Sequence, residues 1–233
     1  MGGSISASRR ELPDGDVVEK RLVKALQQRA AAAKSSVKSF DAILMKFSKI
    51  DMAFDQVRDV FKRFASAGWI LVADKHKRGT IDLEQLKACF RELKVEFTEE
   101  EVQMFYEEGD VDHNRRISFK EFIVVLALAY LLGEPLNSDG KSRIGLPDLE
   151  WSFETIEDAF VFFDKNGDGY VTKEEMIESI HESSHATNTQ QDSIGVERFE
   201  EMDWDRDGRV TFKEFLLAFT GWVGIEDDED QED

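Results

Sequence analysis

A run of alternating oxygen-bearing side chains in residues 164–175 constrains this chain more than any other feature. These side chains fall at the first, third, fifth and twelfth positions of the run: Asp164, Asn166, Asp168 and Glu175. Alternate residues of a tightly turning loop point inward, and calcium takes six to eight oxygen ligands at about 2.3–2.6 Å. Gly169 at the sixth position permits the positive φ of a sharp turn, and Tyr170 at the seventh would offer its backbone carbonyl. The run therefore predicts a calcium-binding loop between two helices.

The same pattern recurs in residues 203–214 and predicts a second calcium-binding loop. Acidic side chains occupy the same four positions: Asp203, Asp205, Asp207 and Glu214. Arg209 stands at the seventh position and would offer its backbone carbonyl. Thr172 and Thr211 occupy the ninth positions of the two loops, where a water commonly lies between the side chain and the ion.

A third copy, residues 110–121, keeps all its ligand positions but lacks the glycine. Its ligand residues, including the backbone carbonyl at the seventh position, are Asp110, Asp112, Asn114, Arg116 and Glu121. The sixth position holds Arg115, and a non-glycine residue in the left-handed conformation costs about 1–2 kcal/mol. The positive charge of Arg115 and Arg116 also opposes a bound cation. We therefore expect weak or absent calcium binding in this copy.

The fourth copy, residues 74–85, is the most altered. His76 and Arg78 replace oxygen ligands, and Gln85 replaces the acid at the twelfth position. Nine residues that the other copies lack, Ala65–Ala73, separate this loop from its entering helix. We expect this copy to bind no calcium and to act as a structural partner for the next one.

The four copies form two close pairs. A β-branched residue stands at the eighth position of each copy, at intervals of 36, 54 and 39 residues: Ile81, Ile117, Val171 and Val210. Such residues suit a short strand between paired loops, so the spacing predicts two lobes of two helix–loop–helix units each. The expected parts are an N-terminal extension, an N-lobe, a linker rich in Gly, Pro, Ser and Asn, a C-lobe and an acidic disordered tail: residues 1–50, 51–132, 133–150, 151–225 and 226–233.

These loops identify the chain as a member of the EF-hand superfamily, and about residues 40–225 resemble the plant calmodulin-like calcium-binding proteins with an extended N-terminus. The subfamily resemblance rests on the Met-Gly-Gly start, the Phe-rich hands, the Glu-Glu-Met-Asp-Trp-Asp run at 200–205 and the acidic tail. It implies an all-α EF-hand fold and a calcium sensor, without enzymatic activity, whose hydrophobic groove binds an amphipathic helix of a target protein. A calcium buffer and a constitutive regulatory subunit, similar to the calcineurin B-like proteins, are the alternatives.

The composition argues against several other classes. The net charge is −19 and the isoelectric point is near 4.6, whereas a nucleic-acid-binding surface would be basic. Residues 1–50 differ from the rest, with ten Lys and Arg against five Asp and Glu. Cys89 is the only cysteine, so no intramolecular disulfide forms and a reducing, cytoplasmic compartment fits. The sequence shows no catalytic triad, P-loop or dinucleotide-binding motif.

The first six residues match the N-myristoylation pattern. Gly2 becomes the N-terminus after methionine removal, and Ser6 stands at the required position. A single myristoyl chain binds membranes only marginally, and nearby basic side chains could add electrostatic attraction. We therefore expect peripheral membrane association. The longest apolar run, Phe122–Leu132, is shorter than the roughly 20 residues of a membrane-spanning helix.

A basic amphipathic helix is predicted immediately before the N-lobe. Its apolar side chains recur at helical spacing: Phe40, Ile43, Leu44 and Phe47. EF-hand grooves bind helices of this kind. Phe119–Leu132, by contrast, is apolar nearly all round and requires cover from outside its own lobe. We therefore predict that the segment around Phe40–Phe47 docks on the N-lobe as a built-in ligand, and the sequence leaves open whether calcium changes that contact.

Overall fold

Helices form most of the described chain, which confirms the predicted all-α class. The computed structural model describes residues 15–32, 37–67, 79–95, 97–132, 144–183 and 189–225. The helices are α1 (Gly15–Ala31), α2 (Phe40–Leu44), α3 (Phe47–Ala67), α4 (Leu83–Glu92), α5 (Glu99–Gly109), α6 (Phe119–Leu132), α7 (Pro147–Phe163), α8 (Lys173–Ser183), α9 (Thr189–Met202) and α10 (Phe212–Trp222). None of them combines the length and apolar character needed to cross a membrane.

Short backbone pairings join the four helix–loop–helix units, or hands, in two pairs. The hands are numbered one to four in chain order, with loops at residues 74–85, 110–121, 164–175 and 203–214. Strands β1 (Val171–Thr172) and β2 (Arg209–Val210) run antiparallel, with Val171 opposite Val210. In the other pair Ile81 and Ile117 each donate an amide hydrogen to the carbonyl of the other at 2.8 Å. The four β-branched residues at the eighth loop positions therefore meet as predicted. α3 to α6 form the N-lobe and α7 to α10 the C-lobe.

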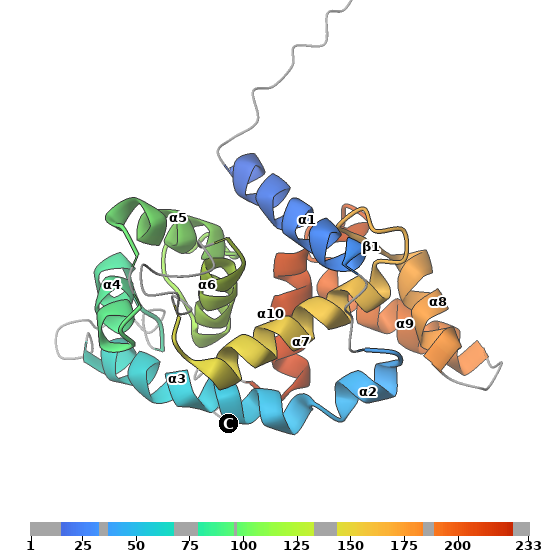
Figure 1. Cartoon of the computed structure of the whole chain (residues 1–233), viewed down its shortest axis with the longest axis horizontal. Coiled ribbons are helices and arrows are strands. Elements are labelled where there is room, and N and C mark those ends of the chain that lie inside the picture. Colours follow the sequence, from blue (N-terminus) through green and yellow to red (C-terminus); the bar gives the residue numbers. More distant parts are fainter. Residues whose placement is uncertain are drawn as a thin grey trace, which may run out of the picture.

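Helix α3 contacts both lobes. In its first half, Phe54 lies 6.2 Å from the ring of Phe153 on α7, and further along Phe61 lies 5.3 Å from the rings of both Phe119 and Phe122 on α6. A helix of 21 residues is about 31 Å long, and Figure 1 shows α3 running beneath both lobes. The residues before Phe47 therefore lie at the end of α3 that packs against the C-lobe.

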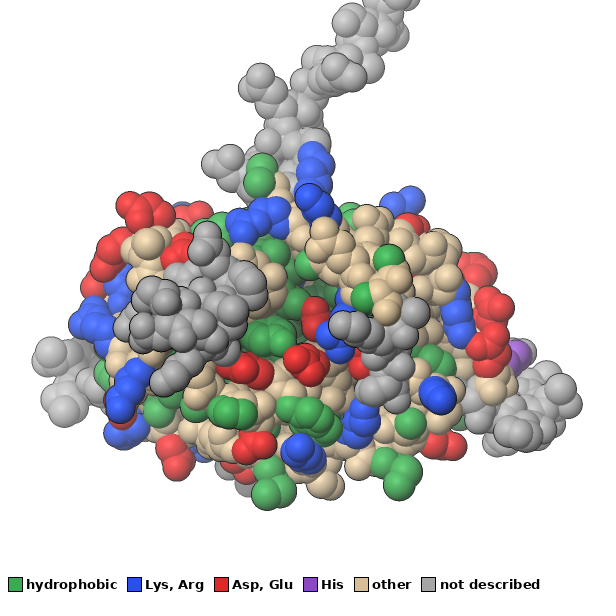
Figure 2. All heavy atoms as spheres, viewed as in Figure 1, with side chains coloured by type: hydrophobic (Ala, Val, Ile, Leu, Met, Phe, Trp, Pro, Cys, Tyr) green, Lys and Arg blue, Asp and Glu red, His purple; other side chains and the backbone are tan. Residues whose placement is uncertain are grey.

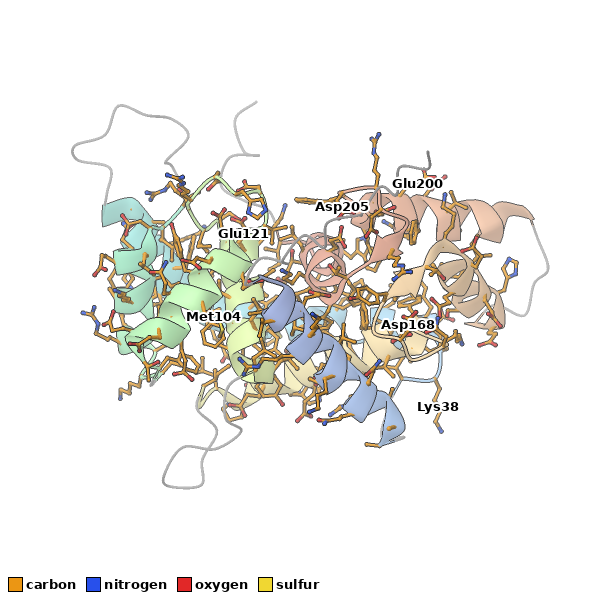
Figure 3. The ribbon with its side chains drawn as sticks, turned by 90° about the horizontal axis from the view of Figure 1, so that it is seen from above. Lys38, Met104, Glu121, Asp168, Glu200 and Asp205 are labelled. Atoms are coloured by element: carbon orange, nitrogen blue, oxygen red, sulfur yellow. The ribbon has the colours of Figure 1, made fainter. Side chains whose placement is uncertain are left out.

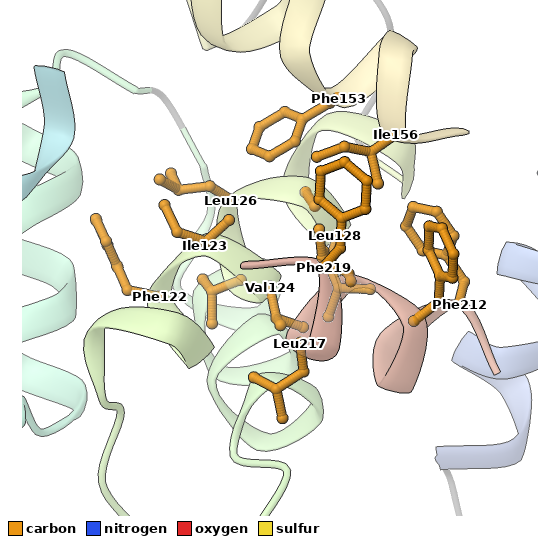
Figure 4. Packing of buried hydrophobic residues seen from close by; sticks show 14 of the residues in the cluster. Phe122, Ile123, Val124, Leu126, Leu128, Phe153, Ile156, Phe212, Leu217 and Phe219 are labelled. Atoms are coloured by element: carbon orange, nitrogen blue, oxygen red, sulfur yellow. The ribbon is translucent and has the colours of Figure 1, made fainter. Parts of the chain in front are cut away.

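The apolar helix α6 lies at the centre of one continuous hydrophobic core. Almost every residue from Phe119 to Leu132 is buried, and helices α1, α7 and α10 pack on α6 in addition to its own lobe. Figure 4 shows Val124 beside Leu217 of α10, and Leu128 near Phe153 and Ile156 of α7. The prediction that α6 needs cover from outside its lobe is confirmed.

The predicted docking of the Phe40–Phe47 segment on the N-lobe is wrong. The Phe40 ring lies 6.0 Å from Phe163 and the Phe47 ring 5.2 Å from Phe219, both in the C-lobe. The physical reason is the length of α3, which carries the preceding residues past α6 to the C-lobe. The cover of α6 that this segment was expected to provide comes from α1, α7 and α10 instead.

Two of the domain boundaries expected from the sequence fall inside helices. α3 begins at Phe47, within the expected N-terminal extension, and α7 begins at Pro147, within the expected linker. Several sequence predictions lie outside the described residues: those on Gly2, on the rest of the insertion after Ala67, on most of the linker, and on residues 226–233.

Candidate calcium-binding sites

The hand-three loop between α7 and α8 is folded by its own carboxylates. Asp164 is 5% exposed, and its Oδ2 accepts the Gly169 amide at 2.9 Å. Glu175, at the far end of the loop, accepts the Asn166 amide at 3.0 Å through Oε1 and the Thr172 amide at 2.9 Å through Oε2. These bonds tie the first ligand position to the sixth residue of the loop, and the twelfth ligand position to the third and ninth residues.

Helix α1 lies against this loop, which the sequence gave no means of predicting. Gly169 has φ +91°, and a Cβ atom at this position would stand 2.7 Å from a methyl group of Val23. Gln27 of α1 donates to the backbone carbonyl of Asp168 at 3.4 Å. Arg29 pairs at 2.8 Å with Asp158, whose side chain is 4% exposed, on the entering helix α7. Glycine at position six thus serves both the turn and the close approach of α1.

The hand-four loop, between α9 and α10, has the same construction. Glu214 is 8% exposed and accepts the Trp204 amide at 3.2 Å and the Thr211 amide at 2.8 Å. Carboxylate oxygens of Asp203, Asp205 and Glu214 lie within 4.8 Å of one another. Gly208 at the sixth position has φ +87°, which glycine adopts without strain, whereas Arg206 at the fourth position has φ +58°.

The hand-two loop also keeps this geometry, although arginine replaces its glycine. Arg115 adopts φ +63°, and its amide donates to Asp110 at 2.8 Å. Glu121 accepts the Val111 amide at 2.9 Å, and carboxylate oxygens of Asp110, Asp112 and Glu121 lie within 4.8 Å of one another. The loop has therefore adopted the left-handed turn at the expense of backbone strain. Figure 3 labels one acid from each of the three loops, Glu121, Asp168 and Asp205.

The protonation equilibria and the unpaired atoms of the loops fit a divalent cation. Burial raises the pKa of Glu121 to about 7 and raises the pKa values of Asp164 and Glu214 above their ordinary range, because each carboxylate has lost solvent. Among the described residues, Asp110 Oδ1 and Asp203 Oδ1 are buried without a hydrogen-bond partner. A cation bound there would supply the positive charge that these carboxylates lack.

The chain belongs to the EF-hand family. A family model described as "EF-hand domain pair" matches residues 54–125 and 153–220, which together make up more than half of the chain. With the acidic loops described above, the chain is a calcium-binding EF-hand protein.

Two individual relatives from a plant confirm the resemblance to plant calmodulin-like proteins. The chain is 40% identical over 233 residues to "Probable calcium-binding protein CML21" of Arabidopsis thaliana, covering 98% of this chain and 95% of the relative. It is 41% identical over 197 residues to "Probable calcium-binding protein CML22" of the same plant, covering 84% and 82%. "Troponin C, isoform 1" of Balanus nubilus is 30% identical over 148 residues, covering 64% of this chain and 83% of the relative.

Replacing both closing carboxylates of the C-lobe, Glu175→Gln with Glu214→Gln, should remove two calcium equivalents. Each change takes charge and bidentate coordination from the twelfth position. Calorimetric titration with magnesium present measures the stoichiometry. The exposed pair Glu174→Gln with Glu197→Gln is the control. Full stoichiometry in the first variant would contradict the assignment.

Strain at position 115 should limit calcium binding in hand two. Arg115→Gly relieves a conformational cost of about 1–2 kcal/mol, which predicts an affinity gain of about tenfold. Arg115→Ala removes the same charge but keeps the strained conformation, so it should gain much less. Titration of both variants separates the two effects, and equal affinities would assign the limitation to charge instead of strain.

Proposed function

We propose that this protein is a calcium sensor whose C-lobe target surface is covered by its own residues 40–47. The observation that carries this proposal is a continuous series of aromatic rings. Phe40 contacts Phe163 at 6.0 Å, Phe163 contacts Phe215 at 6.0 Å, Phe215 contacts Phe219 at 5.8 Å, and Phe219 contacts Phe47 at 5.2 Å. The covering segment is thus joined to the centre of the C-lobe at both of its ends.

Two rings within the series, Phe163 and Phe215, adjoin the calcium loops in the sequence. Phe163 immediately precedes Asp164, the first position of hand three, and Phe215 immediately follows Glu214, the last position of hand four. A change in the direction of Glu214 turns α10 and moves Phe215 and Phe219 with it. The support for a sensor is therefore that rings adjacent in sequence to the loop carboxylates pack in one cluster with the rings of the cover.

The partner we propose is an amphipathic helix of a target protein. Residues 40–47 show which side chains the surface accepts, because two aromatic rings seven positions apart fill it. Exposed Lys49 and half-buried Lys46 flank these rings, and Lys49 lies 3.7 Å from the centre of the Trp151 ring. A basic helix with aromatic or large aliphatic anchors could replace the segment once calcium loosens it.

The test is hydrophobic-dye binding with and without calcium. Wild type should bind more dye when calcium is added. Phe40→Ala with Phe47→Ala should bind dye even in chelator, because its cover is removed. Met45→Ala with Met52→Ala is the matched control, since these side chains are 87% and 68% exposed and cover nothing.

The outcomes separate the sensor from its rivals. If calcium leaves the dye binding of wild type unchanged, the protein is a buffer. If the double Phe variant binds no more dye than wild type in chelator, residues 40–47 do not cover the surface. A partner that co-purifies in chelator and is retained at constant affinity would instead indicate a constitutive regulatory subunit.

We further propose that the protein is cytoplasmic and is held peripherally at membranes by a myristoyl group on Gly2. The support is the sequence pattern at the N-terminus together with the excess of basic residues in 1–50. Gly2→Ala should move the protein fully to the soluble fraction of cells, and intact-mass analysis in a host that expresses the transferase should show the acyl group only on wild type. An unmodified wild-type N-terminus would contradict this proposal.

A further inference from the structure

The side chain of Arg116 in hand two reaches across to hand one. Its Nε donates to the Thr80 hydroxyl at 2.6 Å, and its Nη2 donates to the Thr80 carbonyl at 2.8 Å and to Gln85 Oε1 at 3.3 Å. Asp82 Oδ2 lies 4.0 Å from Nη1. The Arg116 side chain is only 20% exposed, and Thr80 is 6% exposed. Arg116 therefore makes a specific, largely desolvated contact.

Two of the three acceptors of Arg116, the Thr80 carbonyl and Gln85 Oε1, are atoms at positions that bind calcium in an active hand. Within residues 74–85, Thr80 holds the seventh position, whose backbone carbonyl is a ligand, and Gln85 holds the twelfth, whose side chain closes the site. Gly79 at the sixth position has φ +68°, so this part of the loop keeps the turn of a cation-binding hand. The guanidinium thus reaches the seventh and twelfth ligand positions of hand one, where the chain has no acidic side chain.

The C-lobe provides an internal comparison. Arg209 stands at the seventh position of hand four, as Arg116 does in hand two, yet its guanidinium lies 5.6 Å from the centre of the Tyr170 ring. The twelfth-position residues of both partner loops accept amides of their own loops: Glu175 accepts those of Asn166 and Thr172, and Gln85 Oε1 accepts that of Asp82 at 2.8 Å. They differ in charge, because Glu175 is an acid and Gln85 is a neutral amide. An arginine at this position therefore enters the partner loop only in the N-lobe, where the closing residue is neutral.

We propose that the Arg116 guanidinium is the resident cation of hand one. It is permanently charged, and its planar fork of donors can bind two acceptors of one loop at once. The same residue offers its backbone carbonyl to hand two, so one residue holds both loops of the N-lobe. The consequence is that this end of hand one keeps one conformation whether or not calcium is present.

The proposal is tested on the full-length protein in chelator, by thermal unfolding and by hydrogen exchange. Arg116→Met should lower the melting temperature by about 3–8 °C and speed exchange of the Ile81 and Ile117 amides about tenfold. Arg116→Lys should recover only part of this, since an ammonium lacks the fork. Arg209→Met, the matched change in hand four, should leave both amides unaffected. Unchanged exchange of both amides in Arg116→Met would overturn the proposal.

A second variant keeps the proposal falsifiable if Arg116→Met fails to fold. Gln85→Glu places an acid beside the guanidinium and should raise the melting temperature in chelator without adding a calcium equivalent. Where the double variant folds, this gain should vanish in the Arg116→Met background, as a double-mutant cycle would show. An added calcium equivalent in Gln85→Glu alone would overturn the proposal, because calcium would then displace the guanidinium.

Discussion

A helix without a polar face must be buried on every side, and α6 imposes this condition on the whole molecule. Its own lobe can cover only part of it, so α1, α7 and α10 complete the enclosure. The two pairs of hands consequently share one hydrophobic core. α3 extends along both of them, and the position of every N-terminal element follows from this arrangement.

The N-terminal elements are thereby placed against the C-lobe, where the two loops that keep both the ligand residues and the sixth-position glycine lie. α1 contacts the hand-three loop through Val23 and Gln27, and residues 40–47 cover the aromatic cluster between hands three and four. On the face shown in Figure 2, apolar side chains project along the lower edge, where Figure 1 places α2 and α3. The exposed Met45 directly follows α2, and the exposed Met52 lies on α3. The rings of Phe40 and Phe47, by contrast, point inward to the C-lobe. In the N-lobe, under the proposal above, hand one holds the guanidinium of Arg116, a cation that the chain supplies itself.

Features with fixed local spacing could be predicted from the sequence. The paired helix–loop–helix units, the left-handed sixth positions and the pairing of Ile81 with Ile117 all depend on residues a few positions apart or on a repeat. The docking site of Phe40 and Phe47 could not be predicted, because it depends on the length and direction of α3 relative to both lobes. The contact of Arg116 with Thr80 could not be predicted either, because the ligand pattern of one loop does not indicate where the side chain at its seventh position points.

The calcium affinity of the C-lobe in wild type and in Phe40→Ala with Phe47→Ala tests the central claim most directly. If calcium binding and the covering segment oppose each other, linkage requires that removing the cover strengthen calcium binding by the same factor by which calcium weakens the cover. Calorimetric titration should then show affinity about 5- to 150-fold tighter in the double variant, the usual range of such coupling. Equal affinities in the two proteins would show that residues 40–47 are a static part of the core and that calcium does not act on them.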